Sequence, residues 1–339
     1  EELMFVAGVI LKISNHVDLG NQLHQVTCEQ LPDERDLLDV CGGSLSGERR
    51  LPRYWDTPDN ATSATPMTMV DITEWEGVKE RMQTFMDETA VWYTTTGHFV
   101  LGKQQAGHGA RIQHGRDNNH FNHGGYRLRK VYRIQNVELY LKYALQCRTL
   151  AERRDAAEGG GAGAPKLAGG GWRPFMSEAY RRWQRFEAVL NERAGELFLF
   201  HGSGAPRYTI AKEGIDSRLG GGLFGKAAYF AENVSKADEY ATRSDDDGLF
   251  TVYLSRVSLG NAYVHVHDGA QSRVDLTAAK TGVKMKELTR PPFDVKRNVA
   301  WDSLAHMCGR RTGNAHGNPY KHSEIMIYDK SQAYAEFAL

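Results

Sequence analysis

The chain has 339 residues, 41% of them hydrophobic, so it can bury a large core as one large domain or two ordinary ones. Its 42 basic and 42 acidic residues cancel, which excludes a global attraction to nucleic acid or to an anionic membrane. The four dispersed cysteines, Cys28, Cys41, Cys147 and Cys308, form no Cys-x-x-Cys pair and predict neither a zinc site nor a disulfide framework. We therefore expect a soluble globular protein of an intracellular compartment, nuclear or cytoplasmic.

Residues 1–50 mix apolar and acidic segments without a motif, and we treat them as an N-terminal segment of unknown role. Their most apolar stretch, LMFVAGVILKI from Leu3, is too short to span a bilayer and has no basic leader or cleavage site. It predicts a core strand or helix and no membrane segment. The connector LPRYWDTPDNATSATP, which is rich in Pro, Asp, Asn and Thr, follows.

A helix is predicted after this connector. Thr73 and Glu76 have the spacing of a capping box, and four apolar residues recur at helical spacing to form a buried face: Val78, Met82, Phe85 and Met86. The next segment is rich in Gly, Asn and His. We interpret it as a loop and predict no metal site, because nothing holds its histidines on one face: His108, His114, His120 and His123.

The segment YRLRKVYRIQNVELYLKY alternates loosely, as a strand does, up to Asn136, which can cap a second helix. The apolar stripe of that helix would be Leu139, Tyr140 and Tyr143. The Gly-rich stretch near 158–171 predicts a flexible surface insertion, since it cannot bury enough area to fold. An amphipathic helix containing Trp183 is expected beyond it.

The strand-like run ELFLF ends at a polar sequence, His201, Gly202 and Ser203. Strand ends often present residues to a ligand, although a simple strand-to-turn junction has the same pattern. A short helix closed by Gly214 comes next, and then a glycine-rich loop, 220–222, which allows close approach of a ligand but lacks the P-loop pattern. Ser235 is predicted to cap the following helix.

The last third of the chain is mostly strand-like. Two alternating runs begin near Phe250 and Ala262, and a long polar connection, 271–318, is predicted as a loop. Glu324 then heads an apolar strand. An isolated buried carboxylate is costly, so Glu324 must lie at a polar mouth or have a partner.

Four segments, LFHGS, LFGKAAYFAENVSKADEYA, VSLGNAYV and SEIMIYDKSQAYAEFAL, resemble the catalytic domain of poly(ADP-ribose) polymerases in order and approximate spacing. The upstream YRLRKVYRIQNVELYLKY and LPRYWDTP are similar to the start of such domains in members without a regulatory helical subdomain. The resemblance covers about residues 51–339. It implies an α/β (α+β) fold of two packed, mainly antiparallel sheets around an NAD cleft, flanked by helices.

The resemblance also implies a catalytic set of His201, Tyr229 and Glu324. It further implies that Gly202 holds the nicotinamide carboxamide through its backbone and that Tyr229 and Tyr240 sandwich the nicotinamide ring. NAD is then a substrate, and no metal is required. Ser203 and Arg207 are weaker candidates for the adenosine and pyrophosphate end. Where many members carry a serine that binds the carboxamide, this chain has Ala237, so one hydrogen bond worth about 1 kcal/mol is expected to be absent.

The residue types suit this chemistry. Breaking the nicotinamide–ribose bond builds positive charge on the anomeric carbon, so a carboxylate such as Glu324 stabilises the transition state. A histidine donor can fix the sugar, and stacked aromatic rings can hold a leaving group that departs neutral.

Three functions remain open at this stage. The first is an enzyme that transfers one or more ADP-ribose units from NAD to acceptor proteins, itself included. The second is an inactive module of the same fold that binds NAD, ADP-ribose or a protein. Ala237 and the long insertions support it. The third is an RNA- or nucleotide-modifying transferase, suggested only by YRRWQRF around Trp183, a composition more typical of a solvated helix face. Nucleic acid is not otherwise indicated.

Overall fold

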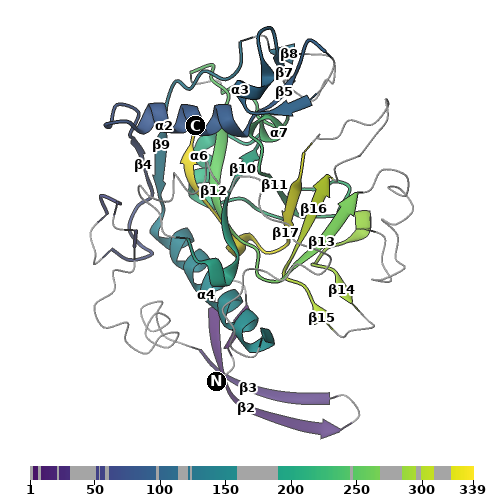
Figure 1. Ribbon diagram of the computed structural model, residues 1–339. Helices are drawn as coiled ribbons and strands as arrows, with labels where there is room; N and C mark the ends of the chain where they lie inside the picture. Colours follow the sequence, from purple (N-terminus) through teal and green to yellow (C-terminus); the bar gives the residue numbers. More distant parts are fainter. Residues whose placement is uncertain are drawn as a thin grey trace.

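The computed structural model describes residues 3–6, 9–20, 23–30, 51–52, 54–57, 61–96, 99–113, 121–122, 124–158, 190–244, 247–267, 285–294, 299–308 and 322–339. Within these residues a nine-stranded sheet forms the centre of the molecule (Figure 1). From edge to edge its strands are β13 (Ala262–His267), β16 (Ser303–Cys308), β17 (Glu324–Ile327), β11 (Ala228–Ala231), β10 (Glu196–Gly202), β12 (Val252–Ser258), β18 (Ala333–Ala338), β9 (Tyr132–Gln135) and β4 (Thr68–Asp71).

Neighbouring strands of this sheet run antiparallel, except β13 and β16, which are parallel. The predicted mixed α/β class with mainly antiparallel strands is therefore confirmed. The two sheets that we expected are joined into one, but the junction is narrow: β10 pairs with β11 only through Phe200 and Ala231. Elsewhere β10 pairs with β12 along its whole length, from Glu196 to Gly202.

Helices cover both faces of the central strands. They are α2 (Val78–Thr89), α3 (Lys103–Ala106), α4 (Val137–Glu158), α6 (Arg207–Glu213) and α7 (Val234–Asp238), with 3-10 turns at Glu192–Ala194, Met285–Glu287 and Lys330–Gln332. Because side chains alternate along a strand, Phe198 and Phe200 pack into one core with α2 and α7, whereas Leu199 packs into a second core with α6.

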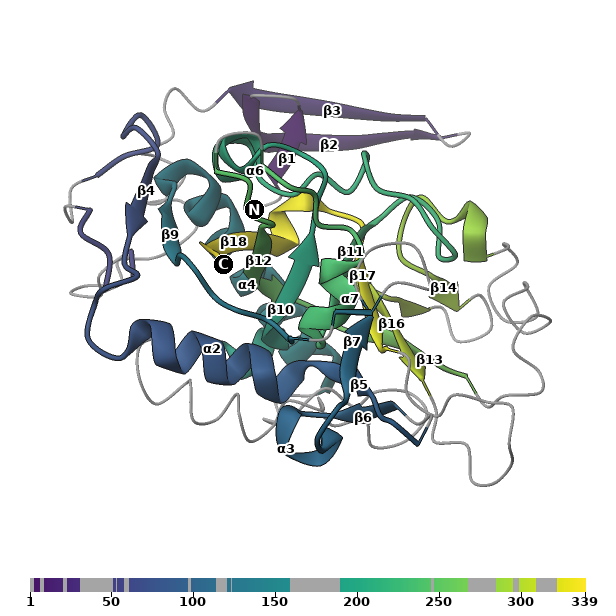
Figure 2. The ribbon, with the colours of Figure 1, turned by 90° about the horizontal axis from the view of Figure 1, so that it is seen from above.

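Three smaller sheets surround the central one. A four-stranded sheet has the order β6 (Phe99–Leu101), β5 (Val91–Tyr93), β7 (Arg111–Gln113), β8 (Phe121–Asn122), and β5 lies beside α7 in both ribbon views (Figures 1 and 2). β1 (Leu3–Val6), β2 (Val9–Gly20) and β3 (Leu23–Gln30) form a separate sheet, so the apolar stretch from Leu3 is strand rather than helix. β14 (Phe293–Asp294) pairs with β15 (Val299–Ala300).

Two predicted helix caps are wrong. α2 begins at Val78 with Gly77 as its N-cap, and the hydroxyl of Thr73 instead accepts a hydrogen bond from the backbone of Val131 at 2.9 Å. α7 begins at Val234 with Asn233 as its N-cap, while Ser235 lies inside the helix. The predicted Asn136 cap of α4 and the end of α6 at Gly214 are confirmed, with Asn136 Oδ1 3.1 Å from Leu139 N. The buried face predicted for α2 is also confirmed.

The loop predicted over 271–318 is wrong in part, because it contains β14, β15 and the central strand β16. β16 lies between β13 and β17. Its pairing with these two strands therefore defines it more strongly than the pattern of its own sequence does. The Gly-rich insertion near 158–171 lies outside the described residues apart from Glu158, which ends α4. The helix predicted around Trp183 also lies outside them.

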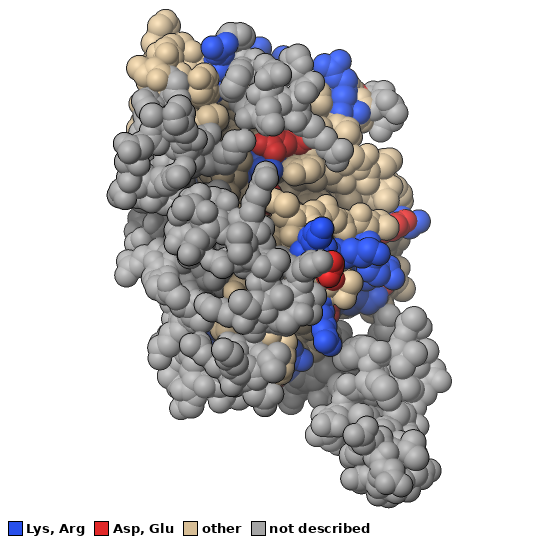
Figure 3. Space-filling view, turned by 90° about the vertical axis from the view of Figure 1, so that its right-hand side faces the viewer, with Lys and Arg blue, Asp and Glu red and all other residues tan. Residues whose placement is uncertain are grey.

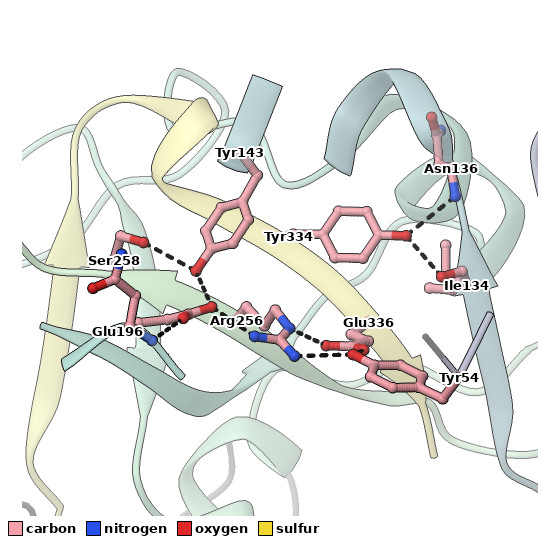
Figure 4. A network of polar contacts seen from close by, with 10 residues as sticks. Tyr54, Ile134, Asn136, Tyr143, Glu196, Arg256, Ser258, Tyr334 and Glu336 are labelled. Carbon is pink, nitrogen blue, oxygen red and sulfur yellow. Dashed lines mark hydrogen bonds and ion pairs between the residues drawn. The ribbon is translucent and has the colours of Figure 1, made fainter. Parts of the chain in front are cut away.

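A buried polar network ties the segment at 54–57 to the sheet (Figure 4). The Arg256 guanidinium donates to Glu196 at 2.8 Å and to Glu336, and the hydroxyl of Tyr54 contacts both Arg256 and Glu336. Tyr143 of α4 donates to Glu196 at 2.7 Å. The network thus joins β10, β12 and β18 to α4 and to residues preceding the first central strand.

Candidate functional site

The narrow junction between β10 and β11 carries the first predicted site residue. His201 lies one residue beyond the single pair that joins the two strands, and its Nδ1 lies 2.8 Å from the backbone oxygen of Tyr229. Because a carbonyl only accepts, Nδ1 carries the proton in the neutral ring. The junction therefore fixes the orientation of the imidazole.

Burial sets the charge of this histidine. Its ring lies 5.3 Å from that of Phe230 and 6.4 Å from that of Tyr253, centroid to centroid. Desolvation lowers the pKa of His201, and the bond to the Tyr229 carbonyl opposes this only in part. The ring is thus neutral at physiological pH, and Nε2 is an acceptor. We expected a donor toward the sugar, whereas this geometry suits acceptance from a sugar hydroxyl.

Gly202 ends β10 under the end of α7. A Cβ atom at this position would lie 1.8 Å from the backbone oxygen of Ala237 and 3.1 Å from the nitrogen of Ala241. Only glycine permits this approach of strand and helix. Ser203 follows, and its Oγ accepts from Ala205 N at 3.0 Å, which shapes the turn after the strand.

Tyr229 lies half-buried on β11. Its hydroxyl donates to the Gly225 carbonyl at 2.9 Å and accepts from Phe224 N at 3.0 Å, so it holds the glycine-rich loop against the sheet. Gly222 passes close to the ring, since a Cβ there would lie 3.0 Å from the Tyr229 hydroxyl. Desolvation, with a contribution from the Glu324 charge, raises the pKa of Tyr229 to about 12. Tyr229 therefore stays a neutral phenol.

Glu324 begins β17 next to Tyr229's strand, where it pairs with Ala231 on one side and His306 on the other. Its side chain is 18% exposed, and Oε1 lies 3.4 Å from Lys236 Nζ on α7. A largely buried carboxylate at this position needs a polar mouth or a partner, and the lysine is such a partner. Burial disfavours the charge on Lys236, but Glu324 and Glu239 together raise the pKa of Lys236, so it stays cationic.

The remaining two predicted binding residues are Tyr240 and Arg207. Tyr240 follows α7, is 42% exposed, and has its ring 5.0 Å from Lys236 Nζ. Arg207 begins α6, where it donates to Asp247 at 2.9 Å and to Thr251 at 3.1 Å. The exposed ring of Tyr240 can therefore stack on a flat ligand, whereas the Arg207 guanidinium already forms an ion pair with Asp247.

The structure brings the three predicted catalytic residues onto neighbouring strands, in the order Glu324 (β17), Tyr229 (β11) and His201 (β10). Sequence reasoning missed Lys236 and Glu239. Their (i, i+3) spacing predicts a lysine–glutamate pair on a helix, but nothing in the sequence links that pair to Glu324.

Among the described residues, no group of three or more His, Cys, Asp or Glu side chains could hold a metal ion. His108 is exposed in a turn, and the other three histidines of its segment lie outside the described residues. No helix in the described part of the chain is long and apolar enough to cross a membrane.

Comparison with known proteins identifies the family of the chain. A family model described as "Poly(ADP-ribose) polymerase catalytic domain" matches residues 110–339. "Poly [ADP-ribose] polymerase 1" of Danio rerio is 28% identical over 167 residues, which cover 47% of this chain and 16% of the relative. The protein of the same name from Xenopus laevis is 27% identical over 167 residues, with the same coverage. The chain thus matches about a sixth of the length of these relatives. Since the family model spans more than half of the chain and contains β10, β11, α7 and β17, the chain belongs to the family of poly(ADP-ribose) polymerase catalytic domains.

Proposed function

We propose that this chain is an NAD-dependent protein ADP-ribosyltransferase, a glycosyltransferase that transfers ADP-ribose from NAD to side chains of acceptor proteins and releases nicotinamide. The observation that carries the proposal is the alignment of His201, Tyr229 and Glu324 on adjacent strands, with Glu324 held by Lys236. Membership of the family supports the transferase class.

In the proposed reaction the bond between the anomeric carbon and the nicotinamide nitrogen breaks, and its electron pair leaves with nicotinamide. An acceptor oxygen or nitrogen attacks the same carbon and loses a proton to solvent. Positive charge on the ribose peaks between these events, so the Glu324 carboxylate acts as a fixed counter-charge. Because nicotinamide departs neutral, no strong acid is needed, which agrees with the neutral state of Tyr229 and His201.

The binding roles extend this proposal. Gly202 would hold the carboxamide through its backbone, Tyr229 and Tyr240 would stack on the nicotinamide ring, and His201 Nε2 would accept a ribose hydroxyl. Ser203 and Arg207 remain candidates for the adenosine and pyrophosphate end. Arg207 would have to share its charge between a phosphate and Asp247, which makes its contribution smaller than that of a free arginine.

The domain that carries this function is proposed to span 51–339. Leu51, Tyr54 and Trp55 pack against α4 and β18, which supports including them although the family match begins at residue 110. Residues 1–50 stay outside this domain. The free, buried Cys147 supports an intracellular location, where thiols stay reduced.

The second candidate is an inactive module that binds NAD, ADP-ribose or a protein. Ala237 favours it, because its side chain cannot provide the hydroxyl that binds the carboxamide in many members of the family. Weaker NAD binding follows from this loss, whereas the bond cleavage depends on Glu324.

Purified protein incubated with adenylate-labelled NAD separates the two candidates. Wild type, Glu324→Gln and His201→Ala are resolved on a denaturing gel, and free nicotinamide is measured in parallel, with exposed Glu138→Gln as the control. The transferase predicts label on the wild type and the control, and its reduction or loss in the two site variants. A smear that collapses to a band in Glu324→Gln would assign chain extension to the glutamate. NAD binding without label or nicotinamide would support the inactive module.

A further inference from the structure

The lysine that holds Glu324 also contacts a second carboxylate. Lys236 Nζ lies 2.7 Å from Glu239 Oε2 and 3.4 Å from Glu324 Oε1. The three side chains are similarly protected from solvent, at 17% exposure for Lys236, 17% for Glu239 and 18% for Glu324. Glu239 therefore makes the shorter contact with the shared cation.

The charges of this trio differ from those of a simple ion pair. One lysine between two ionised carboxylates leaves a net charge of −1, whereas Lys236 with Glu324 alone would be neutral. In a partly buried site such a difference is poorly screened by water or salt. The trio thus keeps negative potential next to the proposed ribose position, while the lysine still fixes the Glu324 side chain.

Glu239 is itself held in place. It lies at the end of α7, one residue before Tyr240, and its Oε1 lies 3.8 Å from His322 Nε2, two residues before Glu324. α7 therefore contacts the start of β17 and the residues just before it through two pairs. Glu239 contacts His322, and Lys236 contacts Glu324. A displacement of Glu239 would move Lys236 toward Glu324.

We propose that Glu239 is a positioning residue, which draws Lys236 away from Glu324 so that the Glu324 carboxylate keeps enough negative charge to stabilise the ribosyl cation. This inference rests on the proposed function of the site. It concerns the rate of bond cleavage and not NAD binding, because the positive charge exists only in the transition state.

The test compares Glu239→Gln, Glu239→Asp and wild type by steady-state nicotinamide release from NAD with water as acceptor. Glutamine keeps the shape and removes the charge, so kcat is expected to fall about tenfold with KM for NAD unchanged. Aspartate keeps the charge and should restore most of kcat. Glu138→Gln, which removes the carboxylate of the exposed Glu138–Lys142 pair on α4, is the matched control and should behave as wild type.

Each outcome decides the inference. A thermal melt of every variant identifies loss of fold, which would lower activity in Glu239→Gln and Glu239→Asp alike and count against a charge role. Unchanged kcat in Glu239→Gln, with an active wild type, overturns the inference and leaves the proposed function standing. A rise in KM alone also overturns it. A wild type that binds NAD and releases no nicotinamide contradicts the proposed function, and this inference with it.

Discussion

At the scale of single residues, the site depends on close contacts that particular side chains permit. Gly202 lets the end of β10 lie under α7, and Gly222 lets the glycine-rich loop cross Tyr229. Neither residue needs an unusual backbone conformation, because in both cases the constraint is the space that a Cβ atom would take. The sequence motif His-Gly-Ser therefore has a packing reason as well as a proposed binding role.

Gly202→Ala tests this packing. The added methyl would meet the Ala237 carbonyl, so α7 must shift, and we expect a loss of stability of about 1–3 kcal/mol together with weaker NAD binding. Gly221→Ala is the control, since nothing lies within 4 Å of a Cβ at Gly221. Urea unfolding and calorimetric titration with NAD measure the two effects. Equal stability of both variants would show that α7 adapts without cost.

At the scale of elements, α7 is the part that most directly shapes the site, because it contains Lys236 and precedes Tyr240. The four-stranded sheet and the end of α2 both hold it in place. Val91 N on β5 donates to Ser235 Oγ at 3.0 Å, and Asn233 Nδ2 donates to the carbonyl of Thr89 at 3.0 Å. β5 and the end of α2 thus help to fix the position of α7, which comes much later in the sequence.

Ser235→Ala removes the first of these supports. The buried N–H of Val91 then lacks its acceptor, which costs about 1–3 kcal/mol of stability. We also expect KM for NAD to rise, since α7 loses the hydrogen bond that attaches it to β5. Thr84→Ala, at an exposed position of α2, is the control. Urea unfolding and nicotinamide-release kinetics check the prediction, which fails if Ser235→Ala matches the control.

The predicted helix caps show which contacts can be read from the sequence and which depend on the tertiary fold. Asn136 bonds within its own helix, so local spacing identified it as a cap. Thr73 and Ser235 have equally good cap spacing, but their hydroxyls accept from Val131 and Val91, residues that only the tertiary fold brings near. Strand β16 was missed for a similar reason. His201, Tyr229 and Glu324 were recognised through a family resemblance, whereas the Lys236–Glu324 contact joins two distant segments and could not be predicted.

At the scale of the whole molecule, a buried network around Arg256 joins distant segments of the described chain (Figure 4). It places Glu196 and Glu336 around one arginine, with Tyr54 as a further partner. Desolvation raises the pKa of Glu336, and Arg256 offsets this only in part. Folding therefore favours the protonated form of Glu336 more than the unfolded chain does.

The raised pKa predicts a pH dependence of stability. Between the ordinary pKa of a glutamate, 4.5, and the higher folded value of Glu336, the folded state binds more protons than the unfolded state. The contribution of Glu336 to stability is thus fully present below this window and is lost as pH rises through the folded pKa. Glu336→Gln removes the titration, so wild type should lose stability relative to the variant as pH rises. Urea unfolding across the window measures this difference, and a constant difference would contradict it.

The charged surface bears on the nucleic-acid alternative. Lys and Arg side chains gather near the middle of the face seen in Figure 3, and Asp and Glu side chains lie among and beside them. Mixed signs on this face agree with the zero net charge of the chain. A polyanion bound at this cluster would meet carboxylates as well as basic side chains.

The most direct test of the account is nicotinamide release in a single turnover, with the enzyme in saturating excess over NAD, by wild type and Glu324→Gln. If the Glu324 carboxylate stabilises the ribosyl cation, the rate in Glu324→Gln should fall by about 100-fold or more, while the Kd for NAD from calorimetry stays near that of wild type. Release by Glu324→Gln at the wild-type rate would contradict the account, because the charge at the head of β17 would then play no part in breaking the bond.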